Sequence, residues 1–142
     1  MLFDKDGKEL FSSYLPVTVS HEIMKKATEL EGVVSYVVND GWHRHRIIVN
    51  DQLEEHRYPG LQPDISEEEL FATGKYAQIV ISYATQHEAS AMAIKLNEQY
   101  SGKISAYANK YVTDIVPEGI SKAHGLDFLK DYLHISRTDI YA

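Results

Sequence analysis

Two parts of the sequence share one order of predicted elements, a helix followed by two strands. In each part, apolar side chains recur at helical spacing, and stretches rich in β-branched and aromatic residues follow them. The elements predicted in this way are a helix over residues 20–30 with strands over 33–38 and 44–49, and a helix over 88–100 with strands over 103–107 and 111–116. This order predicts an α+β domain with a largely antiparallel sheet and helices on one face.

A further helix and strand stand between these two parts. Ser66 followed by Glu69 is a capping box, which predicts a short helix through Phe71. Residues 77–83 read as a buried strand, so the full order is αββ(αβ)αββ. Residues 52–64 are polar and contain two prolines, which indicates a loop.

The two ends of the chain lie outside this order. Residues 1–16 predict a hairpin with its turn at Asp6-Gly7. At the other end, residues 121–133 predict a helix, and residues 139–142 predict the beginning of a strand.

Composition restricts the classes of function. The chain has 142 residues and no cysteine, which excludes thiol catalysis, disulfides and thiolate metal sites. Its formal net charge of −7 argues against a nucleic-acid partner, because such partners need clustered Lys and Arg on one face. No apolar run approaches the roughly 20 residues of a membrane span, and no signal peptide opens the chain. We therefore expect a cytoplasmic protein that binds neither nucleic acid nor membrane.

The sequence DIVPEGISKAHGLDFLKDYLHISRTDIYA, residues 114–142, resembles a segment of the Cof-type phosphatases of the haloacid dehalogenase (HAD) superfamily. In that family the segment returns from the cap to the core through an apolar strand, a proline, a Gly-hydrophobic-Ser-Lys step and a helix. A Leu-x-Ile stretch and a strand entering the metal-binding Gly-Asp motif follow. The matching residues are Ile115, Pro117, Gly119, Ile120, Ser121, Lys122, Leu133 and Ile135, while Ala123 stands where the family usually has glycine.

The resemblance implies a cap domain that lacks its catalytic core. Residues 1–16 would be a hairpin leading from the absent core, residues 17–117 the cap, and residues 118–142 a return helix with a truncated strand. The parent enzyme would hydrolyse a sugar phosphate or related phosphomonoester through an aspartyl-phosphate, with magnesium as its cofactor. This chain would hold no cofactor and would be inactive alone, because the nucleophile and the metal carboxylates would lie in the core. Its exposed strand edges would allow self-association.

Asp4, Asp6 and Gly7 form a D-x-D-G pattern with three interpretations: a phosphoryl-accepting aspartate, part of a calcium loop, or a hairpin turn. Only three residues precede Asp4, and no Gly-Asp or Asp-Asp pair follows to complete a magnesium site, which phosphoryl transfer needs. The alternating acidic positions of an EF-hand are also missing. We therefore predict a turn.

Lys122 is the predicted catalytic residue. The resemblance implies that its ammonium reaches the active site of the core and holds the nucleophile's carboxylate and the phosphoryl oxygens. It also falls in the first turn of the predicted helix, where the helix dipole disfavours a cation, so a nearby anion is expected.

The stretch from Trp42 to Arg46 is the predicted substrate-binding segment. Trp42, Arg44 and Arg46 would share one face of a strand and offer an aromatic platform and guanidinium groups to a phosphosugar. A solvated hairpin face is the alternative. His43 and His45 would lie on the opposite face, where two imidazoles without a third ligand make a poor metal site, so we predict no metal ligands.

Three other functions stay open at this stage. A free-standing α+β ligand-binding or regulatory module would explain the missing catalytic residues. A cap-like interaction protein and a complete small phosphatase using Asp4 are the remaining alternatives.

Overall fold

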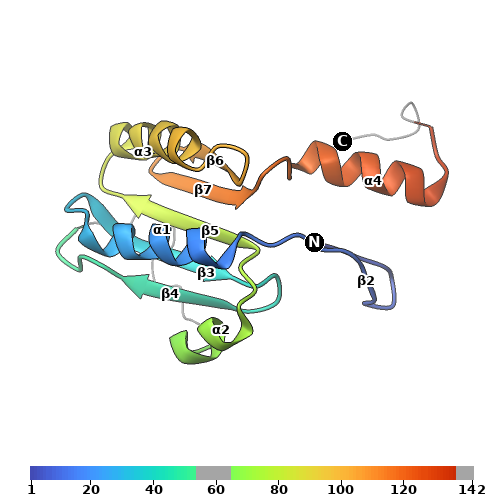
Figure 1. Ribbon diagram of the computed structural model, residues 1–142, viewed down its shortest axis with the longest axis horizontal. Coiled ribbons are helices and arrows are strands. Elements are labelled where there is room, and N and C mark those ends of the chain that lie inside the picture. The colour runs from blue at the N-terminus through green and yellow to red at the C-terminus, as the bar shows by residue number, and fades with distance from the viewer. Residues whose placement is uncertain (54–64, 137–142) are drawn as a thin grey trace.

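Five strands form one antiparallel sheet in the computed structural model, which describes residues 1–53 and 65–136 (Figure 1). The order across the sheet is β4-β3-β5-β7-β6, and every neighbouring pair is antiparallel. The strands are β3 (Val33–Asn39), β4 (Arg44–Ile48), β5 (Gln78–Tyr83), β6 (Ile104–Asn109) and β7 (Val112–Pro117). The two strand pairs that the sequence predicts after a helix are the hairpins β3–β4 and β6–β7 of this sheet.

Two helices, α1 (Val17–Glu29) and α3 (Gln86–Gln99), cover one face of this sheet. They lie side by side, because the Tyr100 hydroxyl donates a hydrogen bond to Glu22 Oε2 at 2.9 Å and Lys26 donates one to Gln99. The shorter α2 (Glu67–Thr73) packs beside the edge strand β4 (Figure 1). The architecture is therefore α+β with helices on one face, as the sequence predicts.

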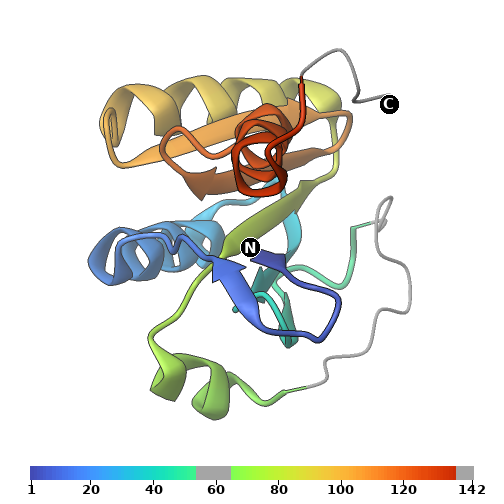
Figure 2. The same ribbon diagram turned by 90° about the vertical axis from the view of Figure 1, so that its right-hand side faces the viewer.

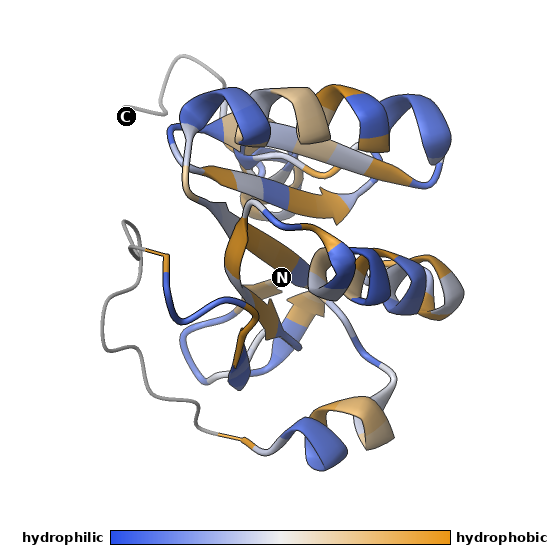
Figure 3. Ribbon diagram, turned by 90° about the vertical axis from the view of Figure 1, so that its left-hand side faces the viewer, coloured by the Kyte–Doolittle hydropathy of each residue, from blue (hydrophilic) through white to orange (hydrophobic). Residues whose placement is uncertain are grey.

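Alternation along the strands determines which side chains enter the core. In β5, Ile79, Ile81 and Tyr83 face the helices, and each is at most 2% exposed. Val80 and Ser82 point to the opposite face and are also buried. The inner strands are accordingly mostly apolar, while α1 and α3 carry a mixture of hydrophilic and hydrophobic residues (Figure 3). Full burial of one such aliphatic side chain contributes roughly 1.5–3 kcal/mol.

A small hairpin and the last helix lie outside the sheet. Strands β1 (Leu2–Phe3) and β2 (Glu9–Phe11) pair with each other, and α4 (Lys122–Leu133) follows β7. Both stand at the same end of the molecule, toward the viewer in Figure 2. No residue of α4 is buried, so this helix contributes little to the core described above.

The prediction of a turn at the D-x-D-G pattern is confirmed. Asp4 Oδ1 accepts hydrogen bonds from the backbone N–H groups of Asp6 and Lys8, at 2.9 and 2.8 Å. Gly7 has φ +80°, a backbone conformation that other residues rarely adopt. The Asp4 carboxylate therefore closes a turn between β1 and β2.

The first helix begins three residues earlier than predicted. Pro16 is its N-cap residue, and its carbonyl accepts from the backbone N–H and the hydroxyl of Ser20. Ser20 is consequently buried in the first turns and does not cap the helix.

The predicted strand over 139–142 lies outside the described residues, as does most of the predicted loop over 52–64. Among the helices that the structure describes, none has the length and hydrophobicity that crossing a membrane requires.

Candidate functional site

Lys122 begins α4 and is exposed. Ser121 caps the helix by accepting a hydrogen bond from the backbone N–H of His124 at 3.1 Å. Within residues 1–53 and 65–136, the Lys122 ammonium has neither a hydrogen bond nor an ion pair. A cation at a helix N-terminus is unfavourable by roughly 0.3–1 kcal/mol, so this side chain is not placed there to stabilise the helix.

Aromatic contacts connect the Lys122 segment to the β3–β4 turn through the N-terminal hairpin. The ring of Phe11, in β2, lies 5.6 Å from the ring of His124 and 5.5 Å from that of Phe128, both in α4. In β1, the ring of Phe3 lies 4.4 Å from that of Trp42. Because β1 and β2 are paired, the β3–β4 turn and the start of α4 lie at the same end of the molecule.

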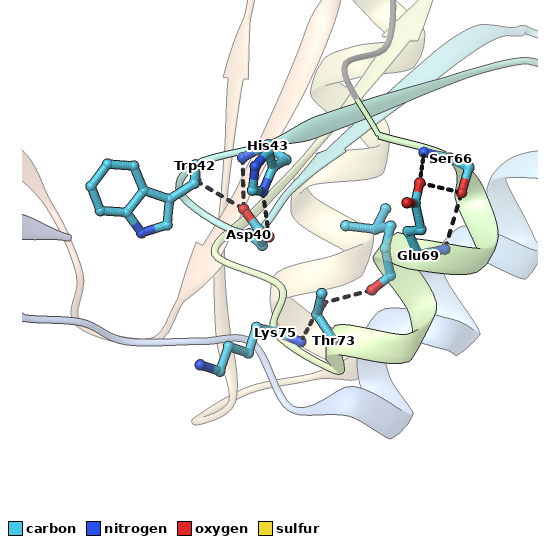
Figure 4. Close-up of polar contacts among 8 residues, drawn as sticks. Asp40, Trp42, His43, Ser66, Glu69, Thr73 and Lys75 are labelled. Carbon is cyan, nitrogen blue, oxygen red and sulfur yellow. Dashed lines mark hydrogen bonds and ion pairs between the residues drawn. The ribbon is translucent and has the colours of Figure 1, made fainter.

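The β3–β4 turn is built around the carboxylate of Asp40 (Figure 4). Oδ1 accepts hydrogen bonds from the backbone N–H groups of Trp42 and His43, both at 2.8 Å, and Oδ2 lies 3.4 Å from His43 Nδ1. Gly41 supplies the φ of +102° that this turn requires. Burial raises the pKa of Asp40, but the hydrogen bonds from His43 and Trp42 outweigh it and hold this pKa below its usual value.

The predicted substrate-binding residues do not all share one strand face. Trp42 lies in the turn, before β4 begins, and is 61% exposed. Arg44 and Arg46 are on β4, opposite Asn39 and Val37 of β3, and so lie on the face of the sheet away from α1 and α3. The expectation of one shared face is therefore wrong for Trp42, because the turn takes it out of the strand.

The two histidines are also separated. His43 belongs to the turn and contacts Asp40, whereas His45 faces the helix side of the sheet, where its Nδ1 lies 2.7 Å from the carbonyl oxygen of Ile65. The expected pairing of His43 and His45 on one strand face is thus wrong, since only His45 is in the strand.

The start of α2 lies near this turn. The predicted capping box is confirmed: the Ser66 hydroxyl accepts from the Glu69 backbone N–H, and Glu69 accepts from the Ser66 backbone (Figure 4). At the end of α2, Thr73 Oγ1 accepts a hydrogen bond from the Lys75 backbone N–H at 3.2 Å. The Lys75 ammonium lies 5.8 Å from the centre of the Tyr14 ring.

Comparison with known proteins identifies the family. A family model described as haloacid dehalogenase-like hydrolase matches residues 2–142. The chain belongs to this family. No curated protein is significantly similar to it in sequence.

Solved structures of HAD proteins share its fold. Two are from Bacteroides thetaiotaomicron. One is a phosphatase of the HAD superfamily, which is 21% identical with a TM-score of 0.68, and the match covers 97% of this chain and 50% of that structure's chain. The other is a haloacid dehalogenase-like hydrolase, which is 18% identical with a TM-score of 0.68, and the match covers 94% of this chain and 50% of that structure's chain. The third is described as a putative HAD/COF-like hydrolase from Plasmodium vivax. It is 15% identical with a TM-score of 0.70, and the match covers 96% of this chain and 49% of that structure's chain. The chain thus spans about half the length of these structures.

The described residues do not form a site for the magnesium that the resemblance implies for the parent enzyme. Between them, residues 1–53 and 65–136 bring together no three His, Asp or Glu side chains that could hold a metal ion. Asp4, the only D-x-D residue resembling a HAD nucleophile, uses its carboxylate in the turn. We therefore derive no chemical step through a metal in this chain.

Asp40 is not among the site residues that the sequence predicts. Asn39-Asp40-Gly41 predicts only a turn between the strands over 33–38 and 44–49. An aspartate at the start of a turn can accept two backbone hydrogen bonds with one oxygen and orient a neighbouring side chain with the other. The aspartate at the start of this turn was therefore the feature of the sequence that could have identified Asp40.

Proposed function

We propose that this chain is the substrate-specificity cap of a HAD-superfamily phosphatase of the Cof type. The parent enzyme hydrolyses a phosphorylated small molecule, a sugar phosphate or related phosphomonoester, with magnesium and an aspartyl-phosphate in its core. Lys122 is the catalytic residue that this chain contributes, and Trp42, Arg44 and Arg46 contribute to substrate binding. A cytoplasmic location and the absence of nucleic-acid and membrane partners remain predictions.

The position of Lys122 is the observation that supports this proposal most. Its ammonium is exposed, has no partner among the described residues, and lies at the end of the molecule that also carries the β3–β4 turn. A site between this end and a second domain would bring a cation and an exposed indole to the same ligand. The match to about half of each HAD structure supports the existence of such a second domain.

Lys122 would act by electrostatic stabilisation. A phosphoryl group and an ionised nucleophile crowd negative charge into one site, and a fixed ammonium favours both the ionised nucleophile and the transition state. Magnesium would neutralise the transferring oxygens in the core. The cap residues would contact the part of the substrate that varies between substrates, and so would determine selectivity.

Phosphatase assays of the parent protein and of this chain test the proposal. With magnesium and an aryl phosphate, we expect turnover by the parent and none above background by the chain alone. A parent that is inactive on a panel of phosphomonoesters but binds small molecules would support the regulatory-module alternative. Activity of the chain alone that disappears in Asp4→Asn would support the small-phosphatase alternative.

A further inference from the structure

The imidazole of His43 has no role in the function proposed so far, yet its orientation is fixed. Its side chain is 56% exposed, while the side chain of Asp40, which it contacts, is only 10% exposed. Asp40 cannot turn away from the ring, because two backbone N–H groups hold its other carboxylate oxygen at 2.8 Å. A nearly buried carboxylate thus orients an exposed imidazole (Figure 4).

This contact selects one tautomer of the neutral ring. Nδ1 faces Asp40 Oδ2 at 3.4 Å, so the proton of the neutral imidazole belongs on Nδ1. Nε2 is then a hydrogen-bond acceptor. In the part of the chain that the structure describes, Nε2 has no partner.

The charges around the ring favour a neutral donor over an anion. Asp40 is ionised at neutral pH. Glu69 is also ionised: hydrogen bonds from Ser66, and to a smaller extent the charge of His43, lower its pKa. With two carboxylates acting on it, this imidazole is a poor site for a second phosphate or a carboxylate. A hydroxyl group, which donates one hydrogen bond and carries no charge, fits the acceptor better.

The turn also presents an aromatic surface next to the imidazole. Trp42 contacts Phe3 on one side and is still 61% exposed. In Figure 4 its indole projects away from the turn. An indole can cover the apolar face of a ligand whose hydroxyl groups are bound from the side.

We propose that Asp40 and His43 form a specificity-determining unit in which Asp40 positions His43 Nε2 to accept a hydrogen bond from a hydroxyl group of the substrate's leaving group. This inference rests on the proposed function, because it needs the turn to face the phosphatase site. His43 is the residue that touches the substrate, and Asp40 is a positioning residue.

Kinetics of the parent enzyme on two substrates test the role of His43. One substrate is a sugar phosphate that the wild type hydrolyses, and the other is 4-nitrophenyl phosphate, whose leaving group has no free hydroxyl. His43→Ala should lower kcat/KM for the sugar phosphate by about 3–10-fold, the value of one hydrogen bond, and leave the aryl phosphate within twofold. His87→Ala, an exposed histidine at the start of α3, is the matched control and should change neither.

The tautomer of His43 in this chain tests the role of Asp40. Nitrogen-15 NMR should show the proton on Nδ1 in the wild type. In Asp40→Asn, which keeps the oxygen that holds the turn, the proton should move to Nε2.

The possible failures are distinct. Equal losses on both substrates, no loss at all, or a wild-type proton on Nε2 would overturn this inference while leaving the proposed function intact. A wild-type parent inactive on every phosphomonoester would overturn the proposed function and this inference with it.

Discussion

The carboxylate of Asp40 makes the stability of the fold depend on pH. Although burial alone would raise it, the pKa of Asp40 is lower in the folded chain, because His43 and Trp42 donate hydrogen bonds to the ionised form. A group of this kind stabilises the fold above its unfolded-state pKa, about 3.9, and the stabilisation disappears as the pH falls through the lower folded-state value.

We therefore expect Asp40→Ala to lower the free energy of unfolding at pH 7 by about 1–2 kcal/mol, and the difference from wild type to shrink below about pH 4. Urea unfolding across pH 2.5–7 measures it. Asp6→Ala, an exposed carboxylate, serves as the control. A difference that stays constant across this range would mean that the charge of Asp40 is not what stabilises the turn.

Lys122 should matter for turnover and not for folding. Loss of one preorganised charged partner typically costs roughly 10²–10³ in turnover, so Lys122→Ala should reduce kcat of the parent to that extent. The same substitution should leave the Tm of this chain unchanged, because the ammonium has no partner among the described residues. Lys122→Arg should restore activity only in part, since a planar guanidinium is not a compact charge.

Lys130→Ala, on the same helix, is the control for Lys122. Lys130 forms an ion pair with Asp131 at 3.1 Å, and its removal should change neither turnover nor Tm by much. Normal turnover in Lys122→Ala would remove the one catalytic role assigned to this chain.

At the scale of elements, strand β6 is an outer edge of the sheet that a side chain protects. Asn97, in α3, donates a hydrogen bond to the carbonyl of Ala106 and accepts one from its N–H, both at 2.8 Å. The amide thus takes the place of a neighbouring strand at the middle of β6. Unprotected edge strands promote association with other chains. At this edge, Asn97 therefore acts against the self-association that exposed strand edges would allow.

Asn97→Ala should expose the edge, lower the free energy of unfolding by about 1–3 kcal/mol, and give concentration-dependent association in sedimentation velocity. Ile94→Ala, an exposed position on the same helix, should do neither. If the wild type already associates and Asn97→Ala does not increase that association, the chains contact each other through another surface.

The elements were predictable because each depends on local signals. Helical spacing, the capping box at Ser66 and the turn at Gly41 act within a few residues, so the order of helices and strands follows from the sequence. The contacts of the site were not predictable in the same way. Whether His43 joins the strand or the turn depends on the Asp40 hydrogen bonds, and the proximity of Phe3 to Trp42 depends on how a separate hairpin packs.

At the scale of the whole molecule, the sheet with α1 and α3 forms one buried core, and α4 with the β1–β2 hairpin forms an attachment to it. The core collects buried side chains from α1, α2, α3 and four strands, whereas α4 buries none and contacts the hairpin through Phe11. Segments with few buried contacts open at lower free energy than the core does. Hydrogen exchange should therefore be faster in α4 than in α3.

Phe11→Ala should destabilise α4 without destabilising the core. Removing the ring takes away the contacts with His124 and Phe128, so the amides of α4 should exchange several-fold faster while those of α3 and β5 keep their wild-type rates. Phe71→Ala, which removes a partly exposed ring from α2, should leave α4 unchanged. Hydrogen exchange with mass spectrometry compares the segments in one experiment. If Phe11→Ala accelerated exchange equally in α3, β5 and α4, the hairpin and the last helix would belong to the same cooperative unit as the sheet.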